Sequence, residues 1–235
     1  MDLSDPTRSV TPTLDGPVLA VLAAAGTPMT VGDVARQVVR GSEIGIRRCL
    51  ARLVEEGIVK ATEMGRNRVH ELNREHLAAP IAERLAGLRP ELFDRIRSAL
   101  SKWKPKPYYA CVFGSAARAD GDVLSDIDLL VVHPPFPGDP RPPKQQRLRD
   151  SLAQMWTEPP PVSAADVRRW PRQVEVVREQ IRSWTGNAAQ IVDLSWAEWL
   201  GERNGDGIFA EIRSDGIDVT PKSQSVTSLL FSESS

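Results

Sequence analysis

The sequence predicts an α+β protein made of two domains joined by helices. Apolar residues recur at helical spacing through most of the first hundred residues, and β-prone runs dominate only after a proline-containing break at 104–107. The chain has 235 residues, enough for two domains with separate cores. We expect a first domain at 1–74, a helical linker at 75–104, a second domain at 105–219, and a serine-rich, disordered tail at 220–235.

The composition is that of an ordinary globular protein, with 41% apolar and 26% charged residues and a net charge of −1. Two distant cysteines, Cys49 and Cys111, and scattered histidines indicate neither a disulfide framework nor a zinc site. The longest apolar stretch, at 18–25, is too short to cross a bilayer, and the acidic start is unlike a signal peptide. We therefore expect a cytoplasmic protein with no membrane partner.

The first domain is predicted to contain three helices and a hairpin. Thr30 and Ser42 are suited to cap the second and third helices, and Gly57 to end the third. A Gly-Arg-Asn turn separates two β-prone runs after the third helix. The expected ranges are helices at 14–26, 29–39 and 43–57 and a hairpin at 58–72.

This order of elements resembles the winged helix-turn-helix family, in which the third helix reads the major groove of DNA. On a helical projection of 43–57, Arg48 and Arg52 lie on the side opposite the apolar face, and Arg47 lies at the edge of that arginine-bearing side. Arg66 and Arg68, at the hairpin tip, are expected to contact phosphates. Residues 1–75 contain ten basic and ten acidic residues, so a protein-docking or targeting role stays open beside DNA binding.

The second part of the chain reads as a mixture of helices and short strands. Proline-rich segments at 134–143 and 158–161 are predicted loops. The expected helices lie at 75–87, 90–103 and 165–184, and the expected strands at 108–113, 126–132 and 188–194.

The candidate functional residues of this part are a Gly-Ser pair at 114–115 and an Asp-x-Asp motif at 126–128. Side chains alternate along a strand, so Asp126 and Asp128 should share a face, and two hard oxygen ligands suit Mg²⁺. Gly114 permits close approach to the backbone, Ser115 offers its hydroxyl and N–H to phosphate oxygens, and Arg118 could reach the same anion. Taken alone, an Asp-x-Asp motif is usually a solvated strand end, and an isolated arginine is usually a surface residue.

Together, GSAAR followed by SDIDLLVV resembles the DNA-polymerase-β-like nucleotidyltransferase superfamily, and its minimal nucleotidyltransferases in particular. The resemblance covers about 105–219 and implies that Gly114 and Ser115, with Ser125, bind the nucleotide. It also implies a third carboxylate on a later strand, a place that Asp193 matches. Asp126, Asp128 and Asp193 would then ligate two Mg²⁺ or Mn²⁺ ions; the alternative for Asp193 is that it caps the helix after it.

The resemblance implies transfer of a nucleotide monophosphate, AMP from ATP or another NTP, to a hydroxyl of a protein, an RNA or a small molecule. The chain lacks the P-loop sequence of γ-phosphate chemistry. Some members of this superfamily are antitoxin-like proteins that modify a partner toxin, and a homodimer is compatible with the pattern. The alternative is a transcription regulator whose second domain senses a nucleotide without turnover.

Overall fold

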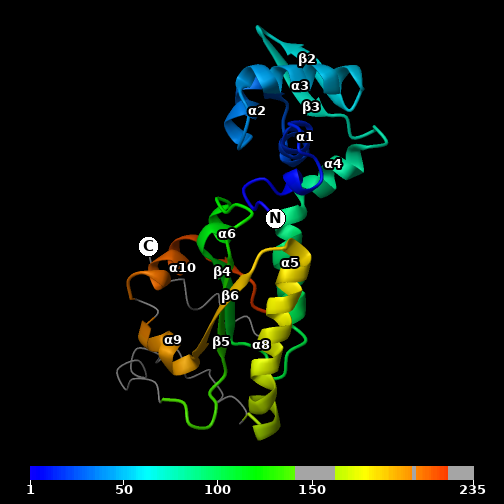
Figure 1. The fold of residues 1–235 in the computed structure, drawn as a ribbon. Helices are drawn as coiled ribbons and strands as arrows, with labels where there is room; N and C mark the ends of the chain where they lie inside the picture. The colour runs from blue at the N-terminus through cyan, green and yellow to red at the C-terminus, as the bar shows by residue number, and fades with distance from the viewer. Residues whose placement is uncertain (141–161, 203–204, 222–235) are drawn as a thin grey trace. The chain divides into compact units, whose positions relative to one another are not determined.

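The computed structural model describes residues 1–140, 162–202 and 205–221, and its contacts divide the chain into two units, Met1–Glu91 and Leu92–Ser235. Each unit combines helices with one small sheet, as expected for an α+β protein (Figure 1). Most of the predicted tail at 220–235 and much of the proline-rich stretch lie outside the described residues. No described helix is both long and apolar enough to span a membrane.

The first unit has the predicted helices and hairpin, with two additions, a 3₁₀ helix at Pro6–Ser9 and a strand at Met29–Thr30. Met29 and Thr30 form a two-residue strand that pairs antiparallel with the hairpin, so the sheet order is β1-β3-β2. A strand this short has no periodicity by which the sequence could reveal it. The elements are η1 Pro6–Ser9, α1 Asp15–Ala24, β1 Met29–Thr30, α2 Val31–Gln37, α3 Glu43–Glu55, β2 Val59–Met64, β3 Asn67–Leu72 and α4 Ala79–Ala86.

Local capping fixes the ends of α2 and α3. The hydroxyl of Thr30 accepts a hydrogen bond from the Asp33 N–H at 3.2 Å, and the Asp33 carboxylate accepts one from the Thr30 N–H at 3.0 Å, which is a capping box. Ser42 accepts from the N–H of Gly45 at 3.2 Å. Gly57, with φ of +78°, follows the end of α3 in a conformation that disfavours other residues. These predicted caps are confirmed.

The core of the first unit joins its helices to the hairpin. The apolar side of α3 packs against α1, and the base of the hairpin closes the cluster. Burial of this surface is the main stabilising contribution in the unit. Its buried members include Val18, Leu22, Val34, Ile46, Leu50, Leu53, Val59 and Leu72.

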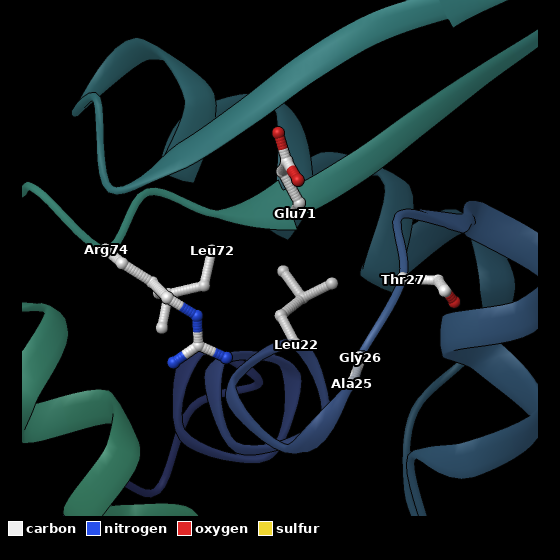
Figure 2. Close-up of a pocket in the computed structure, with 7 residues that line it drawn as sticks. All are labelled: Leu22, Ala25, Gly26, Thr27, Glu71, Leu72 and Arg74. Atoms are coloured by element: carbon white, nitrogen blue, oxygen red, sulfur yellow. The ribbon is translucent and has the colours of Figure 1, made fainter.

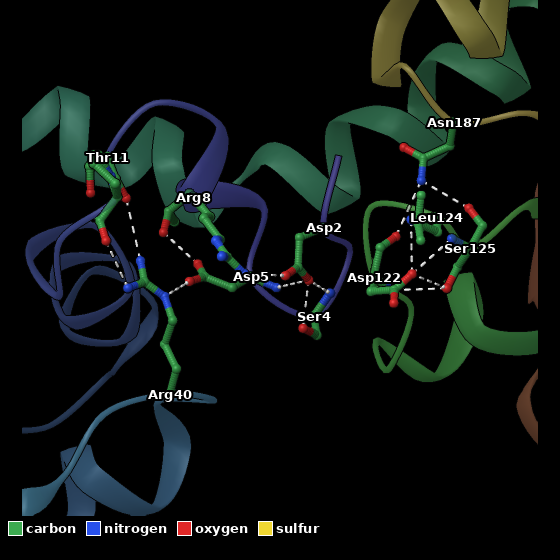
Figure 3. Close-up of polar contacts among 12 residues, drawn as sticks. Asp2, Ser4, Asp5, Arg8, Thr11, Arg40, Asp122, Leu124, Ser125 and Asn187 are labelled. Carbon is green, nitrogen blue, oxygen red and sulfur yellow. Dashed lines mark hydrogen bonds and ion pairs between the residues drawn. The ribbon is translucent and has the colours of Figure 1, made fainter.

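Arg40, in the connection between α2 and α3, orders the N-terminal segment (Figure 3). Its Nε donates to Asp5 Oδ2 at 2.5 Å, and Asp5 is only 4% exposed. The remaining guanidinium nitrogens donate to the carbonyl oxygens of Pro12 at 3.0 Å and Thr13 at 2.8 Å. One cation therefore neutralises a buried carboxylate and satisfies backbone acceptors that precede α1.

We predict that Arg40→Met lowers the opening free energy of η1 and α1 by about 2 to 3 kcal/mol, because it leaves the Asp5 carboxylate buried without a cation. Hydrogen exchange of peptides from the first unit measures this, since every tryptophan lies in the second. Arg36→Met is the matched control. Arg36 pairs with Asp33 at an exposed site, so its loss should change stability by less than about 0.5 kcal/mol. Equal effects of the two substitutions would contradict the prediction.

The second unit contains the predicted strands and the long helix. α6, α10 and β7 are not predicted from the sequence, and α5 begins in the first unit. The elements are α5 Leu88–Leu100, β4 Tyr109–Phe113, α6 Gly114–Arg118, β5 Ile127–His133, α8 Ala164–Thr185, β6 Ala189–Ser195, α9 Trp196–Glu202, α10 Ile208–Asp215 and β7 Ile217–Asp218.

The sheet of the second unit has the order β6-β5-β4-β7, with β5 and β6 parallel and the other pairs antiparallel. α8 lies on one side of it, and α9 and α10 lie on the other (Figure 1). Asp128 is opposite Phe113 on β4 and level with Gln190 on β6, and it belongs to the face toward α9 and α10. Asp193 is level with Val131, and its side chain lies on the α8 face.

Candidate functional site

The two carboxylates of the Asp-x-Asp motif lie at the start of β5. Asp126 directly precedes the strand and Asp128 is its second residue, and both are partly buried. The side-chain amide of Gln190 donates to Asp126 Oδ2 at 3.2 Å. Gln190 and Asp128 are level neighbours on parallel strands, so these three polar side chains gather on the α9 and α10 side of the sheet.

The pair is electrostatically unfavourable without a cation. Burial raises the pKa of Asp128, and the nearby negative charges of Asp126 and of Glu211 on α10 raise it further, whereas Arg118 acts in the opposite direction. Ionised Asp128 therefore costs folding free energy at neutral pH. A divalent ion between the carboxylates would relieve the repulsion, so the residues present fit the metal that the sequence predicts.

Gly114 is required where β4 turns into α6. Its φ is +65°, and a Cβ added there would lie 2.5 Å from Asp128 Oδ2. A side chain at this position would push the carboxylate away from its place. The short helix that follows ends at Arg118, and its C-cap residue Ala119 has a left-handed backbone with φ of 61°. Ser115 is partly buried in α6, and its hydroxyl lies against the backbone of Gly121.

The loop before Asp126 is held by a buried amide (Figure 3). Asp122 Oδ1 accepts from the N–H and hydroxyl of Ser125, both at 2.9 Å. Asn187, only 2% exposed, donates to the carbonyl oxygens of Ser125 at 2.9 Å and Asp122 at 3.3 Å. The predicted nucleotide ligand Ser125 thus takes part in shaping the loop, and Asn187 is a positioning residue that the sequence analysis missed. Its signal is a polar residue placed between a helix-ending glycine and an apolar strand.

Arg118 lies among carboxylates. Its Nε donates to Asp120 Oδ2 at 3.0 Å, and Nη1 lies 3.7 Å from Glu211 and 3.8 Å from Asp215 on α10. The guanidinium is therefore oriented by protein anions in this structure. A phosphate approaching it would have to compete with these exposed ion pairs, each of which is weak.

The structure does not bring Asp193 to the Asp126–Asp128 pair. Asp193 is three residues beyond Gln190 on β6, about 10 Å along the strand, and its side chain points to the opposite face of the sheet. Its Oδ2 accepts a hydrogen bond from Trp170 Nε1 on α8 at 2.8 Å. Protein atoms that displace water from the carboxylate raise the pKa of Asp193, and the Trp170 hydrogen bond opposes this.

Protein groups around the pair supply a limited ligand set. Among the described residues, no group of three or more His, Cys, Asp or Glu side chains is arranged to hold a metal ion. An ion on Asp126 and Asp128 would take its other ligands from water and from phosphate oxygens, which is the usual coordination of Mg²⁺ at nucleotide sites.

The arginines proposed for DNA contact differ in their surroundings. Arg47 pairs with Glu43 at 2.9 Å, and Arg52 pairs with Asp15 on α1. By contrast, three exposed arginines make no ion pair with any described residue: Arg48 on α3, and Arg66 and Arg68 of the hairpin.

The first unit also has a small pocket between the end of α1 and β3 (Figure 2). Arg74 reaches across it and donates to the Ala23 carbonyl oxygen at 3.0 Å, so its guanidinium satisfies a backbone acceptor in the last turn of α1. None of the predicted functional residues lines this pocket. The lining residues are Leu22, Ala25, Gly26, Thr27, Glu71, Leu72 and Arg74.

Residues 94–183 match the family model described as a nucleotidyltransferase domain. The matched range contains β4, α6 and β5, and with them the Gly-Ser pair and the Asp-x-Asp motif, but it ends before β6. Curated proteins and solved structures gave no match to the chain. The family match supports nucleotide transfer in general terms and leaves the roles of the β6 residues to be argued from the structure.

We predict that Gly114→Ala weakens Mn²⁺ binding, because the new methyl group displaces the Asp128 carboxylate. It should also cost about 1 to 2 kcal/mol for the left-handed backbone. Gly65→Ala is the control, since Gly65 has a φ of +63° and an added Cβ would have nothing within 4 Å. The control should show the backbone cost alone in hydrogen exchange of the hairpin, with unchanged Mn²⁺ affinity by calorimetry. Unchanged Mn²⁺ affinity in Gly114→Ala would contradict the proposed contact.

Proposed function

We propose that the second unit is a metal-dependent nucleotidyltransferase that moves AMP, or another nucleotide monophosphate, from an NTP to a hydroxyl of a protein, an RNA or a small molecule. The observation that carries the proposal is the placement of Asp128 beside Asp126 and against the backbone of Gly114. The match of this segment to the nucleotidyltransferase domain supports it.

In this proposal Asp126 and Asp128 would hold Mg²⁺ or Mn²⁺, which when bound would supply positive charge to the phosphate oxygens. Gly114 and Ser115 bind the triphosphate near the carboxylates, with Arg118 turning from its ion pairs toward phosphate. Gln190 keeps Asp126 oriented through its amide, and Asn187 fixes the loop from which Asp126 projects. These positioning groups remove motions that would otherwise oppose in-line attack.

The transfer itself exchanges one phosphorus–oxygen bond for another. The acceptor hydroxyl oxygen bonds to the α-phosphorus, the bond from that phosphorus to the bridging oxygen of pyrophosphate breaks, and the hydroxyl proton passes to solvent. The sequence-derived role of Asp193 as third ligand would require it to reach the opposite face of the sheet. Its hydrogen bond to Trp170 favours a structural role instead.

The second candidate is a nucleotide sensor without turnover. It is favoured by one observation, the neutral Gln190 beside the carboxylate pair on β6. A pair of carboxylates suffices to bind a metal–nucleotide complex, whereas two-metal catalysis needs more anionic ligands. Release of pyrophosphate distinguishes the two candidates.

We propose that the first unit is a winged helix that binds DNA. The order α1-β1-α2-α3-β2-β3 supports this proposal, as does the exposed position of Arg48 on α3. In the same proposal Arg66 and Arg68 contact phosphates, while Arg47 and Arg52 would have to leave their carboxylate partners to take part.

We predict that Asp126→Asn and Asp128→Asn each reduce nucleotide transfer to background, because each removes an anionic metal ligand. The assay follows labelled pyrophosphate from each NTP with Mg²⁺ or Mn²⁺ and a host lysate as acceptor source. In EDTA, Asp128→Asn should melt at or above the wild-type temperature, since the raised pKa of Asp128 means that its ionised form destabilises the fold above the usual carboxyl pKa. Full transfer by both variants would refute the assignment.

For DNA, we predict that Arg48→Ala costs about 1 to 3 kcal/mol and relaxes sequence preference, as expected for a base contact. Arg66→Ala should weaken binding to all sequences alike and lower the salt slope by about 1, as expected for a phosphate contact. Selection from a random DNA pool at low salt, followed by titration at several salt concentrations, measures both effects. Arg36→Ala, which alters an exposed arginine of α2, is the control. No enriched sequence in the pool would favour protein docking instead.

A further inference from the structure

The residue that lies beside the carboxylate pair on β6 is Gln190. It is level with Asp128 in the parallel pairing of β5 and β6, and neighbouring level residues of parallel strands point to the same side of a sheet. The hydrogen bond from its amide to Asp126 Oδ2 at 3.2 Å independently places the Gln190 side chain at the pair. A third ligand from β6 would therefore have to come from position 190.

The acidic residue of β6 is on the other face. Asp193 lies three positions after Gln190 on the strand, an odd offset, so the two side chains point to opposite sides of the sheet. Trp170 of α8 holds the Asp193 carboxylate there with a 2.8 Å hydrogen bond. No rotamer of Asp193 can carry its carboxylate through the sheet, because the strand itself and its neighbour β5 intervene.

Charge then limits how many ions the pair can hold. Two carboxylates supply two negative charges, and the amide of Gln190 supplies none. Glu211 of α10 adds to the negative potential at Asp128 but is drawn to Arg118, with 3.7 Å between the charged groups. The described residues hold no cluster of three candidate ligands. Among the residues that the structure describes, a second divalent ion would find no anionic protein ligand of its own.

We propose that the site binds a single divalent ion, on Asp126 and Asp128, and that Gln190 is the residue that sets this number. This inference rests on the proposed function, because it assumes that the pair binds a metal with a nucleotide. Gln190 acts as a positioning residue for Asp126, and a carboxylate at the same position would create a second metal site.

The test is a count of bound Mn²⁺ on the full chain, by electron paramagnetic resonance with a saturating non-hydrolysable ATP analogue. The wild type should bind one protein-held ion. Gln190→Glu should bind two ions, and its affinity for the second should be about tenfold or more higher than that of the wild type. Gln190→Met, which is uncharged and of similar length, should still bind one.

Asp193→Asn is the discriminating variant, and it should leave the Mn²⁺ count at one. Melting in EDTA checks the folded state of every variant. Without metal, Gln190→Glu should melt at a lower temperature than the wild type, because a third negative charge joins the pair. Mn²⁺ should raise its melting temperature by more than it raises that of the wild type. Gln190 is exposed, so the substitution disturbs no core packing.

Two tight ions in the wild type, loss of an ion in Asp193→Asn, or a single ion in Gln190→Glu would each overturn the inference and leave the nucleotidyltransferase proposal standing. Failure of the wild type to bind any Mn²⁺ with the analogue would overturn the proposed function, and this inference with it. The count is independent of turnover, so it applies equally to an enzyme and to a sensor.

Discussion

The close approach of the Asp128 carboxylate to the backbone of Gly114 is the constraint on which the second unit depends. β4 and β5 pair so that Phe113 faces Asp128, and the chain must then leave β4 without a side chain to make room for the carboxylate. The positive φ of Gly114 starts α6 in the same step. The position of the Asp128 carboxylate therefore depends on both the pairing of β4 with β5 and the turn into α6. A change in any one of the three would require a change in the others.

The Asp128 carboxylate is partly buried, and the charged groups around it do not fully compensate its negative charge. Burial and the charge of Asp126 both disfavour ionised Asp128, and Arg118 offsets only part of this cost because Asp120 and α10 also attract it. A chain selected for stability alone would place a neutral residue at one of these positions. Retaining both carboxylates makes sense where a cation is bound, so the strain of the metal-free state and the proposed activity have the same origin.

Much of the local structure could be predicted from the sequence, because the signals are local. Thr30 and Ser42 cap the helices expected to follow them, and the apolar runs that form β4, β5 and β6 were recognised by composition. Short pairings such as β1 with β3, and β7 with β4, could not be predicted, because a two-residue strand is defined only by its partner. The ion pairs of Arg52 with Asp15, and of Arg118 with Glu211 and Asp215, likewise join residues that are distant in the chain.

The difference between Gln190 and Asp193 shows what a sequence motif alone cannot predict, namely the face of the sheet on which a side chain lies. The family resemblance points to an aspartate on β6, but which face Asp193 occupies depends on the register between β5 and β6. That register is set by apolar residues: Leu130, level with Val192, packs toward α9 and α10, while Val131 points to the other face beside Asp193. Ligand chemistry at such a site is therefore decided by core packing, and a shift of one residue would exchange an amide for an aliphatic side chain without altering composition.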